Sequence, residues 1–351
     1  MSMEMIRPNP YSDDRVKRKT TVVTGAGGFI GGHLVADLLE RGFTDVRAVD
    51  VKPRERWFQL HEGVHNVEAD LTRRDACMDV LEGAEHVYNL AADMGGMGFI
   101  ENYKAACMLN VLINTHLLEA AREHGVERFF FSSSACVYNL AKQQDADIAP
   151  LREEDAYPAM PEDGYGWEKL FSERMCRHFR EDYGVETRVA RYHNVYGPLG
   201  SYDGGREKAP AALCRKVAEV KLGQSDGILI WGDGNQTRSF MYIDDCVLGT
   251  QLIMHSDIRE PINLGSDELV TIDELVDIIE GAAGVRVGRE YDPTKPRGVN
   301  GRNSDNTRIL QRLGWEPSIR LDEGIARTYE WIERQVRGAG VETGRDVFTA
   351  A

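Results

Sequence analysis

Thr24-Gly25-Ala26-Gly27-Gly28-Phe29-Ile30-Gly31 stands between a β-branched run at 21–24 and a helical pattern of apolar residues at 31–41. Glycines at these places let the backbone turn tightly, approach a pyrophosphate and pack the following helix against a sheet. The start of that helix adds amide donors and the positive end of its dipole. The string therefore predicts a dinucleotide-binding loop; the alternative is a tight strand-to-helix turn without a ligand.

An acidic residue, Asp50, ends the next predicted strand, 19 residues beyond Gly31. A carboxylate there accepts hydrogen bonds from an adenosine ribose and disfavours the extra phosphate of NADP, so we expect NAD as the cofactor. Later strand ends line the same crevice in this type of sheet. They add the weaker cofactor-binding candidates Asp70, Leu71, Leu90, Ala91 and Ala92.

Strand-like and helical patterns alternate over residues 20–195. Runs rich in β-branched or aromatic residues predict strands at 21–24, 46–49, 64–69, 86–90, 129–132 and 187–190. Apolar residues at three-to-four spacing predict helices at 31–41, 105–124 and 165–183. Such alternation builds a parallel sheet with helices on both faces, so the expected fold class is α/β, a Rossmann-type doubly wound sheet.

The pattern changes after about Tyr196 into Gly-rich and Pro-containing loops with shorter predicted helices. These helices lie near 210–221, 244–255, 272–282 and 321–337. We expect 20–195 to bind NAD and 196–337 to form mainly a smaller substrate-binding lobe, with some return to the first domain. Residues 1–19 are expected to be a flexible leader and 338–351 a flexible tail.

Composition limits the kinds of molecule that this protein is expected to bind. A net charge of −15 over 351 residues repels nucleic acid and anionic lipid, so an anionic substrate needs local basic residues. No apolar run is long enough to span a bilayer or to form the centre of a signal peptide, which favours a cytoplasmic protein. The six cysteines lack CxxC spacing, so neither a metal site nor a disulfide framework is expected.

A phenol and an ammonium lie four residues apart in the string YGWEK, as Tyr165 and Lys169. On a helix both project from one face, and the cation lowers the pKa of the phenol towards neutrality. Tyr165 then takes a proton from a sugar hydroxyl while hydride leaves the same carbon. Ser134, which closes the preceding SSS string, would hydrogen-bond the reacting oxygen. The alternative is a core tyrosine beside a solvated lysine.

The strings TGAGGFIG, SSS and YGWEK together resemble the extended short-chain dehydrogenase/reductase superfamily, many of whose members act on nucleotide sugars. A ring ketone acidifies the neighbouring C–H bonds, so a base on one ring face and an acid on the other can invert a carbon. Cys136, two residues after Ser134, is a candidate base and equally a small buried hydrophobe. Lys208 opposes the dipole of a predicted helix start, and is either the acid or a solvated lysine.

Longer strings resemble the GDP-mannose 3,5-epimerases, a group within the NAD-dependent epimerase/dehydratase family, from residue 20 to 335. They are AADMGGMGFI (91–100), SSSACVY (132–138), RYHNVYGP (191–198), GGREKAPAA (204–212), WGDGNQTRSF (231–240) and GRNSDN (301–306). The resemblance implies a homodimer that oxidises C4 transiently with NAD and converts GDP-α-D-mannose to GDP-L-galactose, with GDP-L-gulose from C5 inversion. It also implies redox roles for Tyr165, Lys169 and Ser134, and acid–base roles for Cys136 and Lys208.

The same resemblance implies a set of substrate-binding residues. They are Gly95, Ser134, Ala135, Cys136, Asn194, Glu207, Lys208, Ala209, Lys216, Gln236, Thr237, Arg238 and Arg302. Lys216, Arg238 and Arg302 suit a diphosphate, because guanidinium groups bind paired oxygens and an ammonium adds charge. Two places depart from the family: Asn139-Leu140 replaces a common Pro-Glu, and Val299-Asn300 replaces a more basic pair. We expect these to loosen the loop over the sugar or weaken a phosphate contact.

Rival functions are separated by single features. An epimerase-reductase of the GDP-fucose synthase kind consumes NADPH, which Asp50 opposes. A 4,6-dehydratase would carry an Asp-Glu pair after its Ser-Thr, and a simple 4-epimerase leaves Cys136 and Lys208 unexplained. A non-catalytic NAD-binding regulator has no need of Tyr165 and Lys169.

Overall fold

The computed structural model describes residues 14–339. Most of the predicted leader and tail therefore lies outside the described residues. Of the leader, Val16–Arg18 forms a short 3-10 helix, η1. At the other end helix α10 (Leu321–Ala339) extends just past the predicted start of the tail.

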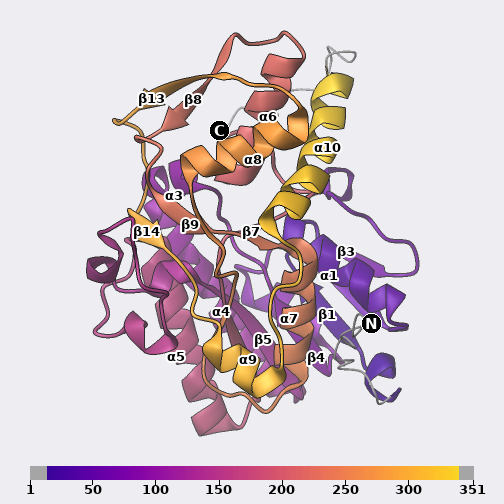
Figure 1. The fold of residues 1–351 in the computed structure, drawn as a ribbon. Coiled ribbons are helices and arrows are strands. Elements are labelled where there is room, and N and C mark those ends of the chain that lie inside the picture. The colour runs from indigo at the N-terminus through magenta and orange to yellow at the C-terminus, as the bar shows by residue number, and fades with distance from the viewer. Residues whose placement is uncertain (1–13, 340–351) are drawn as a thin grey trace, which may run out of the picture.

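Seven parallel strands form the main sheet, in the order β11-β6-β5-β4-β1-β2-β3 (Figure 1). They are β1 (Thr21–Thr24), β2 (Val46–Asp50), β3 (His65–Glu68), β4 (His86–Asn89), β5 (Arg128–Ser134), β6 (Thr187–Tyr192) and β11 (Ile262–Leu264). The six predicted strands are confirmed. Strand order runs outward from β1 in both directions, so the fold is the expected doubly wound α/β sheet.

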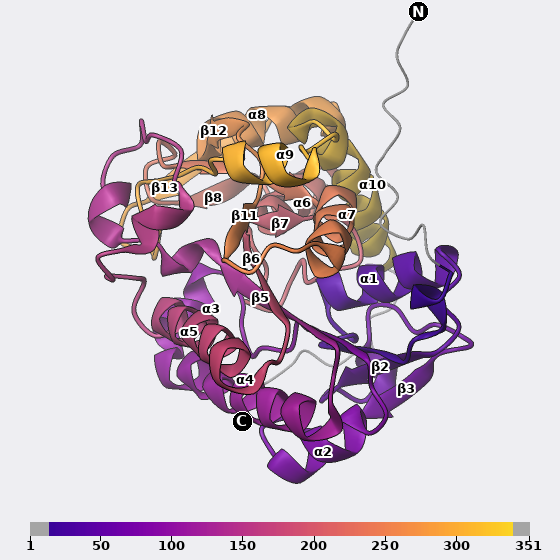
Figure 2. The ribbon, with the colours of Figure 1, turned by 90° about the horizontal axis from the view of Figure 1, so that it is seen from below.

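Helices cover both faces of this sheet (Figure 2). On one face lie α1 (Phe29–Glu40) and α7 (Ile243–His255); on the other lie α2 (Arg74–Leu81), α4 (Lys104–His124) and α5 (Tyr165–Tyr183). Successive strand side chains point to opposite faces. In β5, accordingly, Phe130 packs with the α1 and α7 side and Phe129 and Phe131 with the other.

A second group of elements lies at one end of the sheet (Figure 1), where α6 (Ala209–Lys221), α8 (Ile272–Ala283) and α10 pack together. Its strands are β7 (Val195–Tyr196), β8 (Gly227–Trp231), β9 (Thr237–Ser239), β10 (Met241–Tyr242), β12 (Leu269–Thr271), β13 (Gly288–Asp292) and β14 (Gly301–Arg302). The predicted helices after residue 196 are confirmed. Two elements from this later part of the chain return to the first domain: β11 is a strand of the main sheet, and α7 packs on one face of that sheet.

Three helices were not predicted: α2, α3 (Met97–Asn102) and α9 (Thr307–Leu313). Each spans two turns or so, too short for a clear apolar period. Within residues 14–339 no helix combines the length and the apolar character needed to cross a membrane. The same stretch contains no group of three or more His, Cys, Asp or Glu side chains placed to hold a metal ion, and its six cysteines are buried free thiols.

Candidate active site

The glycine loop is shaped for close approach of a ligand. Gly25 has φ of 71°, and a side-chain carbon on it would lie 2.8 Å from the carbonyl carbon of Leu90. Gly28 caps α1 without a side-chain hydrogen bond, so the amides of the first turn keep their donors. This loop and helix start form a cradle that suits the pyrophosphate of NAD.

Asp50 holds the glycine loop in place. Its carboxylate is buried and accepts hydrogen bonds from the backbone N–H groups of Gly27 and Lys52, each at 3.0 Å. A carboxylate has lone pairs beyond these two bonds, so the same group can accept ribose hydroxyls. Trp57, which was not predicted, packs on Gly27, where a side-chain carbon would lie 2.7 Å from its ring.

The weaker cofactor candidates fall in different surroundings. Leu90 and Ala91 lie against the glycine loop, and Ala91 N–H donates to Thr24 Oγ1 at 3.3 Å. Ala92 is half-buried beside them in sequence. Leu71 is buried in the hydrophobic core, whereas Asp70 is exposed and accepts from the backbone N–H of Thr72 at 3.0 Å.

The predicted redox pair occupies the first turns of α5. Lys169 is buried, with its Nζ 4.7 Å from the centroid of the Phe131 ring and 5.5 Å from that of Tyr165. Burial raises the pKa of the Tyr165 phenol well above its ordinary value, while a hydrogen bond with Ser134 lowers it. The predicted fall of this pKa towards neutrality is therefore absent from the protein by itself.

Cys136 lies where β5 ends and a 3-10 turn begins. Ser134 caps this turn, with its Oγ accepting from the N–H of Cys136 at 3.2 Å. The thiol packs with Tyr165, Phe99 and Ile100. Burial raises the pKa of Cys136 to about 11. The candidate base and the candidate redox phenol thus share one buried cluster.

Arg302 faces that thiol. Its Nη1 donates to Cys136 Sγ at 3.5 Å, its Nε donates to Gln143 Oε1 at 2.8 Å, and its Nη2 pairs with Glu162. The guanidinium is buried, and each nitrogen has a protein partner. Arg302 therefore lies at the candidate acid–base centre. Glu162 and Gln143 were not predicted, because neither lies in a recognisable spacing with Arg302.

Lys208 reaches the same centre from the start of α6. Its ammonium makes no hydrogen bond or ion pair with any residue in 14–339. Burial lowers the pKa of Lys208, and the nearby Cys136 and Cys246 thiols oppose this. The loop before α6 is held against the loop after β4 by a bond from Gly96 N–H to Arg206 O at 3.0 Å.

Two buried polar side chains lack a complete set of partners in this region. Glu207 has one oxygen 3.7 Å from Arg215 Nη2, and its other oxygen is buried without a hydrogen bond. Gln236 donates to Trp231 O at 2.8 Å, and its Oε1 is also buried without a partner. Such atoms are costly to bury unless a ligand completes them. Both belong to the predicted substrate set.

Arg238 is a largely buried cation without a carboxylate partner among the described residues. Its guanidinium donates to the carbonyl oxygens of Thr237, Arg297 and Val299 at 2.7, 3.1 and 2.6 Å. Burial, with the charge of Arg302, lowers the pKa of Arg238 to about 9. An anionic ligand beside Arg238 would stabilise the charged form of the guanidinium, which fits the predicted diphosphate contact.

The other predicted substrate residues are less distinctive. Lys216 donates to Leu229 O at 2.5 Å, and burial lowers its pKa. Asn194 donates to Ser239 O at 2.9 Å, and Thr237 to Ala146 O at 2.5 Å. Gly95 and Ala135 are buried near Arg206 and Cys136 respectively, whereas Ala209 is exposed in the first turn of α6.

The two departures from the family tie loops down. Asn139 accepts from Ala141 N–H at 2.8 Å and donates to Pro158 O at 2.8 Å, so it caps the turn it begins. Asn300 donates to Gln144 O at 2.6 Å. The expected loosening of the loop is not found, because each amide bridges two segments.

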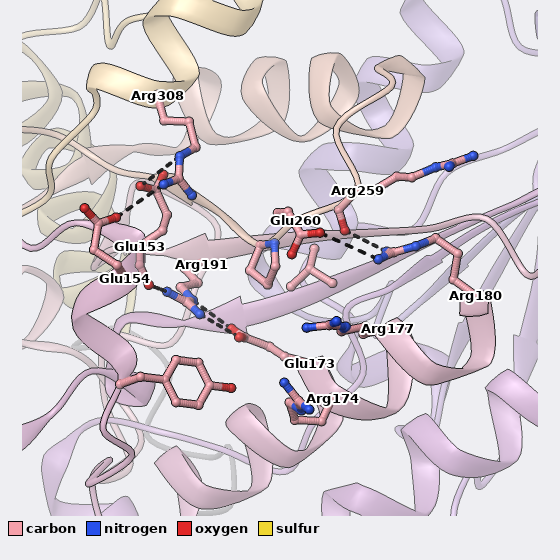
Figure 3. Close-up of a pocket in the computed structure, with 13 residues that line it drawn as sticks. Glu153, Glu154, Glu173, Arg174, Arg177, Arg180, Arg191, Arg259, Glu260 and Arg308 are labelled. Carbon is pink, nitrogen blue, oxygen red and sulfur yellow. Dashed lines mark hydrogen bonds and ion pairs between the residues drawn. The ribbon is translucent and has the colours of Figure 1, made fainter. Parts of the chain in front are cut away.

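A separate cavity of about 200 Å³ opens beside the far end of α5 (Figure 3). It contains none of the predicted site residues. Glu173 and Arg191 form a buried pair there at 2.8 Å, and Glu173 also accepts from Ser133 Oγ at 2.6 Å. Because Glu173 follows Lys169 by one helical turn, the pair with Arg191 ties α5 to β6, and the bond from Ser133 ties it to β5, behind the candidate site.

Comparison with known proteins gives a consistent grouping. Residues 21–265 match the NAD dependent epimerase/dehydratase family. GDP-mannose 3,5-epimerase 1 of Oryza sativa subsp. japonica is 48% identical over 318 residues, 90% of this chain and 82% of that protein. GDP-mannose 3,5-epimerase of Arabidopsis thaliana is 46% identical over 317 residues, with the same coverage of 90% and 82%. UDP-glucose 4-epimerase of Thermus thermophilus, solved with NAD, has a TM-score of 0.78 and 26% identity, covering 91% of this chain and 99% of its own.

Proposed function

The chain belongs to the NAD-dependent epimerase/dehydratase family, and from that premise we propose that it is a GDP-mannose 3,5-epimerase. It converts GDP-α-D-mannose to GDP-L-galactose, and to GDP-L-gulose when C5 alone is inverted. The relatives that share nearly half of its residues bear that name. The buried polar and charged groups around Cys136 support the same assignment.

The glycine loop and Asp50 would hold NAD, which when bound would supply the hydride acceptor and donor for chemistry at C4. Tyr165 takes the proton of the C4 hydroxyl and returns it when the ketone is reduced, with Ser134 as a hydrogen-bond partner of that oxygen. Because burial alone raises the pKa of Tyr165, the phenolate depends on nearby positive charge. Lys169 provides one such charge from the next turn of α5.

Inversion uses the two groups that converge on the sugar. The thiolate of Cys136 removes a proton from the carbon beside the ketone, and the electron pair moves into an enolate. Lys208 as its ammonium returns a proton to the same carbon from the opposite face of the ring. The sulfur gains one proton from the carbon and the nitrogen gives another proton to it, so the net charge of the site is unchanged over one inversion.

One observation carries this proposal above the others: the half-buried Lys208 ammonium lies near enough to the Cys136 thiol for the two groups to affect each other's charge, and it makes no hydrogen bond or ion pair with any residue in 14–339. A cation placed there for stability would be paired. A 4-epimerase does not use such a pair. An epimerase-reductase would draw on NADPH, which Asp50 disfavours.

The decisive experiment measures solvent exchange. The NAD-loaded enzyme is incubated with GDP-mannose in deuterated water, and the sugar is analysed by NMR and mass spectrometry. Deuterium at C5 and C3 with products of L configuration supports the proposal. Parallel reactions with UDP- and dTDP-hexoses test whether the enzyme requires guanine as the nucleotide base of its substrate. Inversion at C4 without exchange, or net reduction with NADPH, would overturn it.

We also propose a homodimer formed through α4 and α5. These neighbouring helices expose apolar side chains together, namely Met108, Leu109, Leu112, Trp167 and Phe171. A second copy of the chain would cover them, in keeping with the implied dimer. Light scattering is expected to give twice the chain mass, falling to one chain in Leu109→Glu/Phe171→Glu. The control Leu310→Glu alters an exposed leucine on α9 and is expected to stay dimeric; a monomeric wild type contradicts the proposal.

A further inference from the structure

Five titratable side chains from five separate segments face the Cys136 thiol. They are Glu162 in the loop before α5, Tyr165 in α5, Lys208 at the start of α6, Arg238 in β9 and Arg302 in β14. Glu162 is the one carboxylate in this set. It is the group whose charge opposes the surrounding cations.

The bonds of Glu162 tie it to both the thiol segment and Arg302. Its backbone N–H donates to Cys136 O at 3.0 Å, and its side chain accepts from Arg302 Nη2. Gln143 holds Arg302 Nε at 2.8 Å from the other side. With these two nitrogens fixed, the planar guanidinium has its remaining Nη1 directed at Cys136 Sγ, 3.5 Å away.

The charges of Arg302 and Glu162 have opposite effects on the Cys136 thiol. A guanidinium this close to sulfur favours the thiolate, but a carboxylate paired with it offsets that charge. Burial of Glu162 alone would raise its pKa, yet the charge and hydrogen bond of Arg302 hold that pKa below its ordinary value, so Glu162 stays ionised. The pair is therefore close to neutral as seen by the thiol.

Building on the proposed function, we propose that Glu162 is a positioning residue that acts through Arg302. It aims the guanidinium at the Cys136 sulfur and offsets its charge, so that Cys136 rests as a neutral thiol between turnovers. A neutral thiol resists oxidation and alkylation better than a thiolate does. Arg302 remains in place as a hydrogen-bond donor to the sulfur.

The test compares two nearly isosteric variants by the alkylation rate of Cys136. The NAD-loaded enzyme without sugar is treated with iodoacetamide from pH 7 to 9, and the Cys136 peptide is quantified by mass spectrometry. Glu162→Gln removes the charge and is expected to speed alkylation roughly three- to thirtyfold, because the fall in the pKa of the thiol is partly offset by weaker nucleophilicity of the thiolate. Gln143→Met loosens Arg302 without changing any charge, and is expected to stay within about twofold of wild type.

An unchanged or slower rate in Glu162→Gln overturns the proposal, and so does an equal rise in both variants, which would indicate a loosened site. Thermal melting checks that the variants fold. Should Glu162→Gln fail to fold, Arg302→Gln tests the same pair by a change of opposite direction. Loss of the cation is expected to slow alkylation of Cys136 at least threefold. The alkylation assay contains no sugar, so its failure is distinct from failure of the deuterium-exchange test of the proposed function.

Discussion

Two groups of basic side chains in this protein differ in whether carboxylates pair with them. The cavity group, Arg191, Arg259 and Arg308, pairs with the carboxylates of Glu173, Glu186, Glu153 and Glu154. Figure 3 shows the pairs made by Arg191 and Arg308. The site group, defined as Lys208, Arg238 and Arg302, has one carboxylate between them, that of Glu162. Paired cations of the first group hold segments together. Cations of the second group that lack a carboxylate partner lower stability unless an anionic ligand binds beside them. They therefore indicate where an anionic substrate would bind.

The largest expected effect comes from removing a spare cation at the centre. Lys208→Met is expected to lower kcat for GDP-mannose epimerisation about 10² to 10⁴-fold, the usual range for loss of a general acid. The melting temperature is not expected to fall, because the ammonium makes no hydrogen bond with the part of the chain that the structure describes, and burial lowers its pKa. Kinetics and calorimetry on the same preparation measure both. A variant that melts early but keeps its kcat would give Lys208 a structural role instead.

Removing a paired charge from the cavity group should do the reverse. Glu173→Gln breaks the buried pair with Arg191, and we expect the free energy of unfolding to fall by about 3–5 kcal/mol. Urea titration measures this loss. Glu181→Gln is the matched control, since it breaks an exposed pair with Arg177 on the same helix and is expected to change the free energy of unfolding far less. Similar losses in the two variants would remove the distinction.

A third variant tests the diphosphate. Arg238→Met is expected to weaken GDP binding about 10- to 100-fold, the effect of losing a charged hydrogen bond. Isothermal titration with GDP measures the affinity. Arg259→Met, in the cavity group, is the control and should bind GDP as the wild type does. If both variants bind equally well, the site group does not hold the diphosphate.

The smallest expected effect concerns His193, whose pKa is lowered to about 3 by burial, with Arg302 and Arg191 of the two groups adding to the shift. The folded protein keeps this ring neutral, whereas the unfolded chain binds a proton below its ordinary pKa of about 6.5. Stability therefore falls as pH drops from 6.5, by about 1.4 kcal/mol per pH unit from this residue. His193→Gln should reduce the slope of unfolding free energy between pH 6 and 4 by that amount. An unchanged slope would show that the ring is protonated in the fold.

Local patterns predicted much of the fold and half of the site. The glycine loop, Asp50, Tyr165 and Lys169 all lie within single strand-to-helix units, where spacing along the chain fixes position in space. The group around Cys136 was foreseen only in part. Cys136, Lys208 and Arg302 came from a resemblance, and Glu162 was missed, because Arg302 meets Cys136 and Glu162 across 166 and 140 positions of the chain.

What the amino-acid sequence determined alone is the doubly wound sheet and the face of α5 that carries the phenol and ammonium, since alternation and helical period are properties of neighbouring residues. What only the tertiary structure decided is the charge around the sulfur. Whether Arg302 favours a thiolate depends on Glu162 beside it, and whether Tyr165 ionises depends on how deeply it is buried. Electrostatic effects of this kind depend on distance through space and on exclusion of water, which sequence separation does not report.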